Sequence, residues 1–514
     1  MARPLAERVL VQGALVATTP ISVGGVADPG VDLALAVNGW GRHYVPGTSL
    51  AGPLRHWAER NLEGTYRQDH KGLLDQVFGF QGERGTTDGQ ASWLTVEDAE
   101  VLDPAGAPVE LRDGVGIDRA TGTAAQGIRF ERQALARGTR LRLELELDVP
   151  PEGETDFDGA DAVTLLRHLL EALERGEVRF GGAKTRGLGR VKLDGTPEIR
   201  RYAFGADSGD IFRWLGGEAP GAGVQPRLPR GPSLLRERPK LRVDLSWHPL
   251  TPLLVKSGAD GVGVDGLPLV GALNDSQVAA VLPGSSVKGA LRSHAERIAR
   301  TLTGSPTPGA SSGTRTSGLF TEQLVLPVVR ELFGTAGASG WLSVPDVYQV
   351  HRPLTAEDHR AEELEDWGRH EDHVAIDRFT GGAAESLLFS VHTPPTDGWE
   401  TIVLEVDLPD PEESRTAKEA FLRQRRASVA LFLLTLRDLA AGRIPLGFGV
   451  NRGHGAIAVD SVALEAEHVP DLPGTVRLTP GGGFEGLDEA RAKDLIEALV
   501  TELETTATSA GGEP

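Results

Sequence analysis

Glycine and basic residues gather in one short stretch of an acidic chain. The segment "RFGGAKTRGLGRVKLD" (179–194) has no acidic residue before Asp194, although the 514-residue chain has a formal net charge of −20. Glycines let backbone N–H groups approach an anion closely, and a guanidinium offers two parallel donors to a phosphate. The segment matches neither a Walker loop nor the dinucleotide-binding glycine fingerprint. A phosphate cradle and a glycine-rich hairpin are the two interpretations that these residues allow.

The same stretch returns later with its spacing kept. "GEVRFGGAKTRGLGRVKLD" (176–194) and "GRIPLGFGVNRGHGAIAVD" (442–460) share six of nineteen positions. Recurrence of the arginine favours the phosphate cradle, although a duplicated structural turn would recur too. The phosphate-binding residues predicted here are Gly181, Lys184, Arg186, Gly187 and Gly189 in the first copy, and Gly447, Arg452, Gly453 and Gly455 in the second.

Two further blocks occur twice and in the same order. "PGTSLAGPLRHWAER" (46–60) matches "PGSSVKGALRSHAER" (283–297) at nine of fifteen positions. "IDRATGTAA" (117–125) matches "IDRFTGGAA" (376–384) at seven of nine. Three blocks repeated in one order indicate a tandem duplication.

The proline–glycine block leads into a helix in each copy. We expect a Ser or Thr to cap this helix, whose N–H groups and dipole favour an anion. An ordinary capped helix with solvated charges would use the same residues. The predicted anion contacts are Ser49, Arg55, Ser286, Lys288 and Arg292.

The acidic residues of the third block are followed by arginines. Asp118 and Asp377 each precede an arginine that can pair with them, so a structural or RNA-facing role is favoured over catalysis. "GRHEDH" (368–373) places His370 and His373 beside two acids, a set that could hold a metal ion. The first copy lacks this set and its setting is typical of a solvated loop, which is the favoured interpretation.

The surrounding pattern predicts an α+β fold. Strands are expected at 7–18, 139–149, 240–250 and 399–408, because apolar and polar residues alternate there. Helices are expected at 161–176, 418–442 and 488–504. The order strand–helix–insertion–strand–helix–strand suits a ferredoxin-like or RRM-like unit. The expected organisation is a domain at 1–216, a linker at 217–239, a domain at 240–503 and a disordered tail at 504–514.

Composition limits the class of protein. The chain has no cysteine, which excludes disulfides and thiolate metal sites, and no apolar run of membrane-spanning length. A cytoplasmic protein with no membrane partner is therefore expected. The negative charge argues mildly against nucleic acid, but a groove responds to the charges that line it.

Taken together, the three repeated blocks resemble the RAMP superfamily, specifically the backbone subunits of type III CRISPR effector complexes. The resemblance covers roughly residues 5–200 and 240–465. It implies two tandem RRM-like domains that bind crRNA, meet complementary target RNA and assemble with other effector subunits in a filament-like complex. It also implies thumb-like insertions at about 103–135 and 346–395, with Arg119 and Arg378 at the nucleic acid.

The resemblance further implies an aspartate that cuts target RNA in each copy. Asp32 and Asp265 are the best matches, with Asp28 and Asp260 as nearby alternatives. A divalent ion, Mg²⁺ in the first instance, would lie near the aspartate while the RNA 2′-OH attacks the adjacent phosphate. From the residues alone, Asp32 would be interpreted as a turn residue.

Two other functions remain open on the sequence. One is the same scaffold without nuclease activity, which would only hold the guide. The other is an endonuclease that processes precursor crRNA, which would need a histidine-centred site. The repeated blocks supply no such site, because the position of His454 is occupied by Leu188 in the first copy.

Overall fold

The computed structural model confirms an α+β protein with antiparallel sheets. Its backbone contacts divide the chain into two compact units. The first unit contains Met1–Glu110, Gln133–Lys184 and Leu188–Glu237, and the second contains Leu111–Arg132, Thr185–Gly187 and Arg238–Pro514. The structure describes residues 3–510 except 26–29, 68–71, 83–88, 104–105, 154–157, 206–208, 259–260, 262, 275, 308–316, 362–363, 365–366, 412–416 and 480–482.

The sheet of the first unit is built around its first strand, β1 (Glu7–Ala17). The strand order is β12–β11–β1–β9–β5, and β10 also pairs with β1. Val9, Val11, Leu15 and Ala17 alternate along β1 and face the core, as the alternation predicted. The remaining strands of this sheet are β5 (Leu94–Val96), β9 (Arg140–Val149), β10 (Val191–Leu193), β11 (Glu198–Ala203) and β12 (Val224–Gln225).

Two long helices belong to the first unit. Helix α1 (Gly47–Asn61) begins in the proline–glycine block, and α3 (Gly159–Arg175) buries a leucine-rich face and ends at the left-handed Gly176. Shorter elements complete the unit: β2 (Tyr44–Val45), η1 (Gly64–Arg67), α2 (Leu73–Phe78), β3 (Phe80–Gln81), β4 (Gly89–Gln90), β6 (Ala99–Glu100) and α4 (Asp210–Leu215).

The sheet of the second unit repeats this plan. Its order is β16–β21–β13–β22–β23–β24, with the first strand of the copy, β13, again inside the sheet. The strands are β13 (Lys240–Pro249), β16 (Leu342–Ser343), β21 (Ile402–Asp407), β22 (Ile457–Glu467), β23 (Thr475–Leu478) and β24 (Phe484–Glu485).

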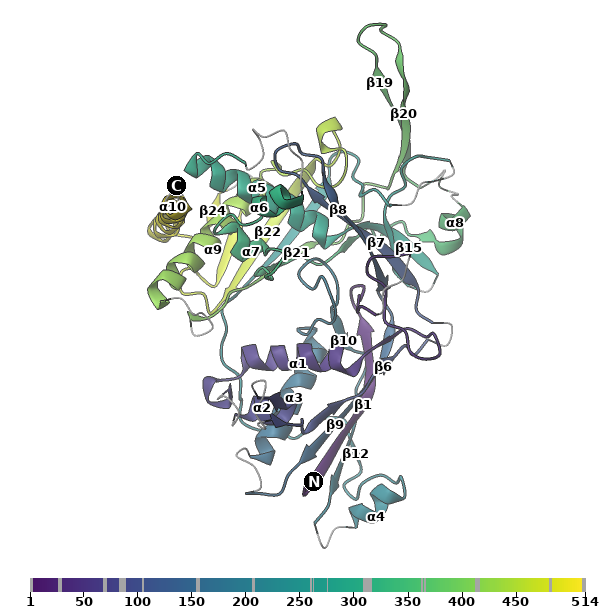
Figure 1. Cartoon of the computed structure of the whole chain (residues 1–514), viewed down its shortest axis with the longest axis vertical. Helices are drawn as coiled ribbons and strands as arrows, with labels where there is room; N and C mark the ends of the chain where they lie inside the picture. The colour runs from purple at the N-terminus through teal and green to yellow at the C-terminus, as the bar shows by residue number, and fades with distance from the viewer. Residues whose placement is uncertain are drawn as a thin grey trace. The chain divides into compact units, whose positions relative to one another are not determined.

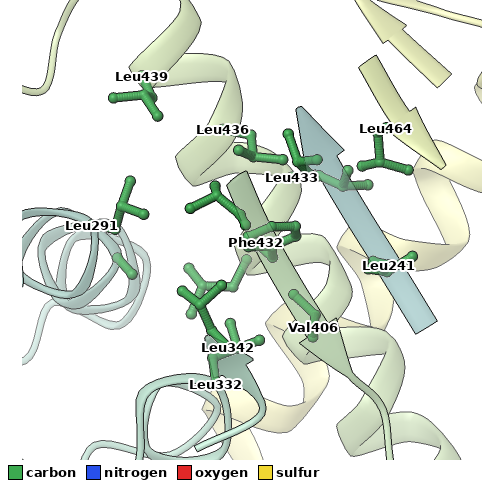
Figure 2. Packing of buried hydrophobic residues seen from close by; sticks show 14 of the residues in the cluster. Leu241, Leu291, Leu332, Leu342, Val406, Phe432, Leu433, Leu436, Leu439 and Leu464 are labelled. Atoms are coloured by element: carbon green, nitrogen blue, oxygen red, sulfur yellow. The ribbon is translucent and has the colours of Figure 1, made fainter. Parts of the chain in front are cut away.

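Helices cover the second sheet and bury its apolar face. Leucines from α5 (Gly284–Thr303) and α9 (Lys418–Ala440) point toward Leu241 of β13 and Val406 of β21, as Figure 2 shows. Helix α10 (Glu489–Ala510) packs on α9 and continues beyond residue 504, where the sequence predicted a disordered tail. No helix among the described residues is long and apolar enough to cross a membrane.

Two β-hairpins carry the "IDR.TG.AA" blocks. Strands β7 (Val109–Ile117) and β8 (Ala124–Leu135) form the first, and β19 (Arg369–Ile376) and β20 (Ala383–Thr393) form the second (Figure 1). The second unit also contains β14 (Val270–Ala272), β15 (Gln277–Leu282), β17 (Val347–Tyr348), β18 (Leu354–Thr355), α6 (Ser317–Gln323), α7 (Val329–Phe333), α8 (Ala356–Ala361) and η3 (Val450–Arg452).

Candidate nucleic-acid interface

A fourth repeated block, which the sequence analysis missed, holds the proline–glycine block in place. "WLTVED" (93–98) and "WLSVPD" (341–346) share Trp, Leu, Val and Asp at the same spacing. Asp98 accepts the N–H of Gly47 at 2.7 Å, and Asp346 accepts that of Gly284 at 2.8 Å. The expected Ser or Thr caps are therefore wrong: neither helix has a side-chain cap on its own chain segment, and each begins one residue after its proline.

Three cations of the proline–glycine helices are bonded within the protein. Arg55 donates to the carbonyl of Gly79 and to Asp75, each at 2.5 Å. Arg292 binds the carbonyl of Gly334, at the same place in its own copy, and also Leu324 and Glu296. Lys288 is buried and donates to the carbonyl of Leu342 at 2.6 Å.

These bonds show what the three side chains do inside the protein. Each one ties a helix to a neighbouring turn or strand, and their predicted contacts with RNA stay predictions. Ser49 and Ser286 are half-buried in the first turns of α1 and α5.

The glycine-rich blocks form a frame in which backbone lies directly against backbone. A side chain at Gly181 would collide with the carbonyl of Ser22, and one at Gly447 with that of Leu254. The same holds for Gly189 and Gly455, which lie against the carbonyls of Phe180 and Leu446. All four glycines, together with Gly187 and Gly453, have positive φ, between 77° and 103°. These glycines therefore set the course of the backbone that presents the intervening arginine.

The framed arginines are exposed and have no acidic partner among the described residues. The guanidinium groups of Arg186 and Arg452 make no hydrogen bond or ion pair with any described residue. Arg452 lies over the ring of Phe389, 4.9 Å from its centroid, a cation–π contact that fixes its direction while leaving its N–H donors available. Lys184 is half-buried, and burial, followed by the positive charge of Arg179, lowers the pKa of its ammonium group.

A further arginine, which the sequence analysis missed, lies beside Arg186. Burial, followed by the positive charge of Arg186, lowers the pKa of the Arg132 guanidinium. No described carboxylate bonds to Arg132, which has Phe130 as a cation–π neighbour at 5.9 Å. Two like charges kept close together without an acid attract an anion between them. Arg129 and Arg132, three residues apart in "RFER" (129–132), were the signal available in the sequence.

The two predicted catalytic aspartates occupy equivalent places. The residue after Asp32, Leu33, accepts the N–H of Gln133 at 2.9 Å. The residue after Asp265, Gly266, accepts the N–H of His392, also at 2.9 Å. Gln133 and His392 hold the same position relative to the two "IDR.TG" blocks, so the structure aligns Asp32 with Asp265. Asp28 and Asp260 lie outside the described residues.

In the second copy the aspartate and the arginine meet the same strand. The exposed carboxylate of Asp265 accepts the N–H of Ser390 at 2.8 Å and its hydroxyl at 3.3 Å. Arg452 lies over Phe389, the preceding residue of β20. Because the side chains of adjacent strand residues point to opposite faces, Asp265 at Ser390 and Arg452 at Phe389 contact β20 from opposite sides.

Comparison with known proteins now identifies the fold family. A family model described as the RAMP superfamily matches residues 14–192 and 248–458. The chain belongs to the RAMP superfamily. It is also 22% identical over 208 residues to a protein of Methanocaldococcus jannaschii named CRISPR system Cms endoribonuclease Csm3, covering 37% of this chain and 79% of the relative.

The hairpin tips of this RAMP protein are shaped by their aspartates. Asp118 and Asp377 each accept two backbone N–H groups of the following turn, at 2.7 to 2.9 Å. These bonds, the one from Thr121 or Thr380 first, lower the pKa of both carboxyl groups. The two aspartates therefore act as turn-forming residues, and the RNA-facing role that the sequence also allowed stays a prediction.

The arginines that follow these aspartates differ between the copies. Arg119 pairs with the buried Glu296 of α5 at 2.7 Å, within the second unit. Arg378 is exposed, and no described residue bonds to it. The next residue, Phe379, is 99% exposed, so the tip of the second hairpin presents a bare aromatic ring and a free cation.

Proposed function

We propose that this RAMP protein is a crRNA-binding backbone subunit of a type III CRISPR effector complex. The observation that carries the proposal is the pair of exposed arginines, Arg186 and Arg452, each in the same glycine frame and each without a described acidic partner. Guanidinium groups with free N–H donors bind phosphate oxygens in pairs. The name of the archaeal relative, a CRISPR endoribonuclease, supports the same assignment.

Each copy is proposed to be a ferredoxin-like, RRM-like RAMP domain with a thumb-like hairpin. In the first copy the chain-ordered strands β1, β5, β9 and β11 lie in the order fourth–first–third–second. The second copy has β22–β13–β21–β16, which is the same order. A split βαβ arrangement of this kind, twice in one chain, would set two guide-binding surfaces in series.

The proposed partners are crRNA, complementary target RNA and other effector subunits. The arginines and the glycine frame would hold the guide through its phosphates, while base pairing would read the target. This division of labour is the one seen in other RNA-guided systems. The exposed tip of the second hairpin, with Arg378 and Phe379, would meet nucleic acid by charge and stacking.

The guide-binding proposal is tested by purifying the chain and measuring the RNA that comes with it. Wild type should carry RNA of defined length, and Arg186→Ala with Arg452→Ala should retain at least tenfold less. Arg140→Ala is the matched control, because Arg140 is an exposed arginine that already pairs with Asp194. Equal retention by all three proteins would contradict the phosphate cradle.

Target-RNA cleavage is proposed at Asp32 and Asp265. Both carboxylates are exposed, and Oδ1 of Asp265 accepts no hydrogen bond from the described residues. One exposed carboxylate suits Mg²⁺, which retains several waters and binds few protein oxygens. When bound, such an ion would supply charge stabilisation at the phosphate. Arg452, which lies over Phe389 of β20, would bind the phosphate backbone of the RNA, whose 2′-OH would attack the adjacent phosphate in line.

A guide-holding protein without nuclease activity is the second candidate. It is favoured by the two bonds from Ser390 to Asp265, which give that carboxylate a role in anchoring its loop.

Cleavage by the assembled complex separates the two candidates. Asp32→Ala should abolish one cut in the target RNA and Asp265→Ala another, while crRNA content stays constant. Asp397→Ala, at an exposed acid that pairs with Arg352, should leave the pattern intact. If both cuts survive in both variants, the chain holds the guide without cutting the target.

A further inference from the structure

Two histidines and a glutamate converge at the base of the second hairpin. Glu371 and His373 are two residues apart on β19 and therefore share one face of the strand. His454 reaches them from the glycine-rich block, with Nε2 at 3.0 Å from Oε2 of Glu371. Nε2 of His373 lies 3.9 Å from the same oxygen. One possible ligand atom from each of the three residues lies within 4.8 Å of the other two.

This set differs from the one that the sequence suggested. His370 turns away to pair with Asp372, on the other face of the strand. The segment is a β-strand, so the expected solvated loop is wrong, and the third member of the set comes from 83 residues further along the chain. Strand alternation selects Glu371 and His373, and the fold adds His454.

We propose that Glu371, His373 and His454 form a Zn²⁺ site. In a tetrahedral zinc site with ligand bonds of about 2.0–2.1 Å, ligand atoms lie about 3.3 Å apart, and the two separations given above bracket that value. Imidazole nitrogens favour zinc and similar transition ions over Mg²⁺. Three protein ligands leave the fourth position open for water or a phosphate oxygen.

The surroundings of the site fit a metal ion. His454 is 7% exposed, so the surrounding side chains hold its ring in a largely buried place. The ring of His373 stacks on Phe389, with centroids 5.0 Å apart, and Arg452 lies over that same phenylalanine. A bound ion would therefore join the base of the hairpin to the loop that carries Arg452, and would place a second positive charge near its guanidinium.

The first copy shows the same frame without the ligands. The positions equivalent to Glu371, His373 and His454 are Arg112, Gly114 and Leu188. All three ligands are replaced, so the site belongs to the second copy alone and goes beyond the shared function proposed above. It also differs from the Mg²⁺ proposed at Asp265, whose only described hydrogen bonds are with Ser390.

The test is zinc binding by the chelator-treated full chain. Calorimetry with ZnCl₂ should give one site per chain, and the thermal midpoint should rise on addition of zinc but not of MgCl₂. His373→Ala and His454→Leu should each weaken zinc binding at least tenfold. The leucine is the residue that the first copy carries at this place, so His454→Leu keeps a side chain that the frame accepts. Co²⁺ should give the absorption bands of a tetrahedral ion in wild type and lose them in both variants.

Three outcomes would overturn the zinc site, and a further variant separates it from the proposed nuclease. His370→Ala is the control, because this histidine lies on the same strand and pairs with Asp372; a loss equal to that of His373→Ala would overturn the site. Absence of stoichiometric zinc in wild type would overturn it too. So would RNA cleavage that needs no metal and is lost in both histidine variants, because this result would assign His373 and His454 to acid–base chemistry. Asp265→Ala should keep zinc while losing a cut, so the zinc site and the proposed nuclease fail independently.

Discussion

A glycine is a weak choice for the first turn of a helix unless space demands it, and in this chain space demands it twice. A Cβ at Gly284 would enter the carbonyl of Val344, and one at Gly47 would enter that of Val96. Glycine is therefore required in both proline–glycine blocks, because a backbone carbonyl lies where a Cβ would be. Asp98 and Asp346, which accept the N–H groups of these two glycines, follow the same close backbone segments by two residues.

This close approach predicts opposite effects for two glycines of one helix. Gly284→Ala should destabilise the chain by about 1–3 kcal/mol, as overpacking does. Gly289→Ala, where nothing lies within 4 Å of the new methyl group, should stabilise it by up to about 1 kcal/mol through helix propensity. Calorimetric unfolding of both variants measures the difference, and a Gly284→Ala protein as stable as wild type would contradict the backbone contact.

At the scale of elements, the first hairpin is anchored by its tip. Arg119 donates to Glu296, which is 2% exposed, and Asp118 accepts from Gln323 of α6 at 3.3 Å. Glu296 keeps Arg292 as a second partner, so loss of Arg119 leaves the glutamate buried with half of its bonding. The attachment of the β7–β8 hairpin tip to α5 and α6 thus depends on a few polar bonds.

We expect Arg119→Ala to destabilise the second unit by about 1–3 kcal/mol, the cost of leaving a buried acceptor incompletely bonded. Amide hydrogen exchange at 117–124 should speed up in parallel. Arg129→Ala serves as the control, because Arg129 is an exposed arginine of the same hairpin that pairs with Asp113. Equal exchange in the two variants would show that the tip pair does not hold the hairpin.

At the scale of the whole molecule, the net charge of −20 is compatible with RNA binding because Arg186 and Arg452 pair with no acid among the described residues. Arg8, Arg201 and Arg242, by contrast, all pair with carboxylates on their sheets. Binding of RNA phosphates releases counterions in proportion to the phosphates neutralised, so Arg186→Ala with Arg452→Ala should also flatten the salt dependence of guide binding.

Repetition made much of this protein predictable from its sequence. Periodicity predicted strands such as β1 and β9 and helices such as α3 and α9. The matched blocks showed that Arg186 and Arg452 are equivalent positions of the two copies. Contacts between segments far apart in the chain could not be predicted from the sequence. The acceptors for Gly47 and Gly284 lie 51 and 62 residues away, and His454 joins Glu371 from 83 residues away, distances at which spacing carries no signal.

The bond between Arg119 and Glu296 has a further consequence, because both residues belong to one polypeptide. Covalent linkage replaces a bimolecular encounter with an effective concentration of order millimolar, so even a contact too weak to hold two separate chains stays closed. Arg378, at the same position of the second hairpin, has no such tethered acceptor among the described residues. Any docking of the second hairpin on another molecule therefore depends on that molecule's concentration, whereas docking of the first is independent of dilution.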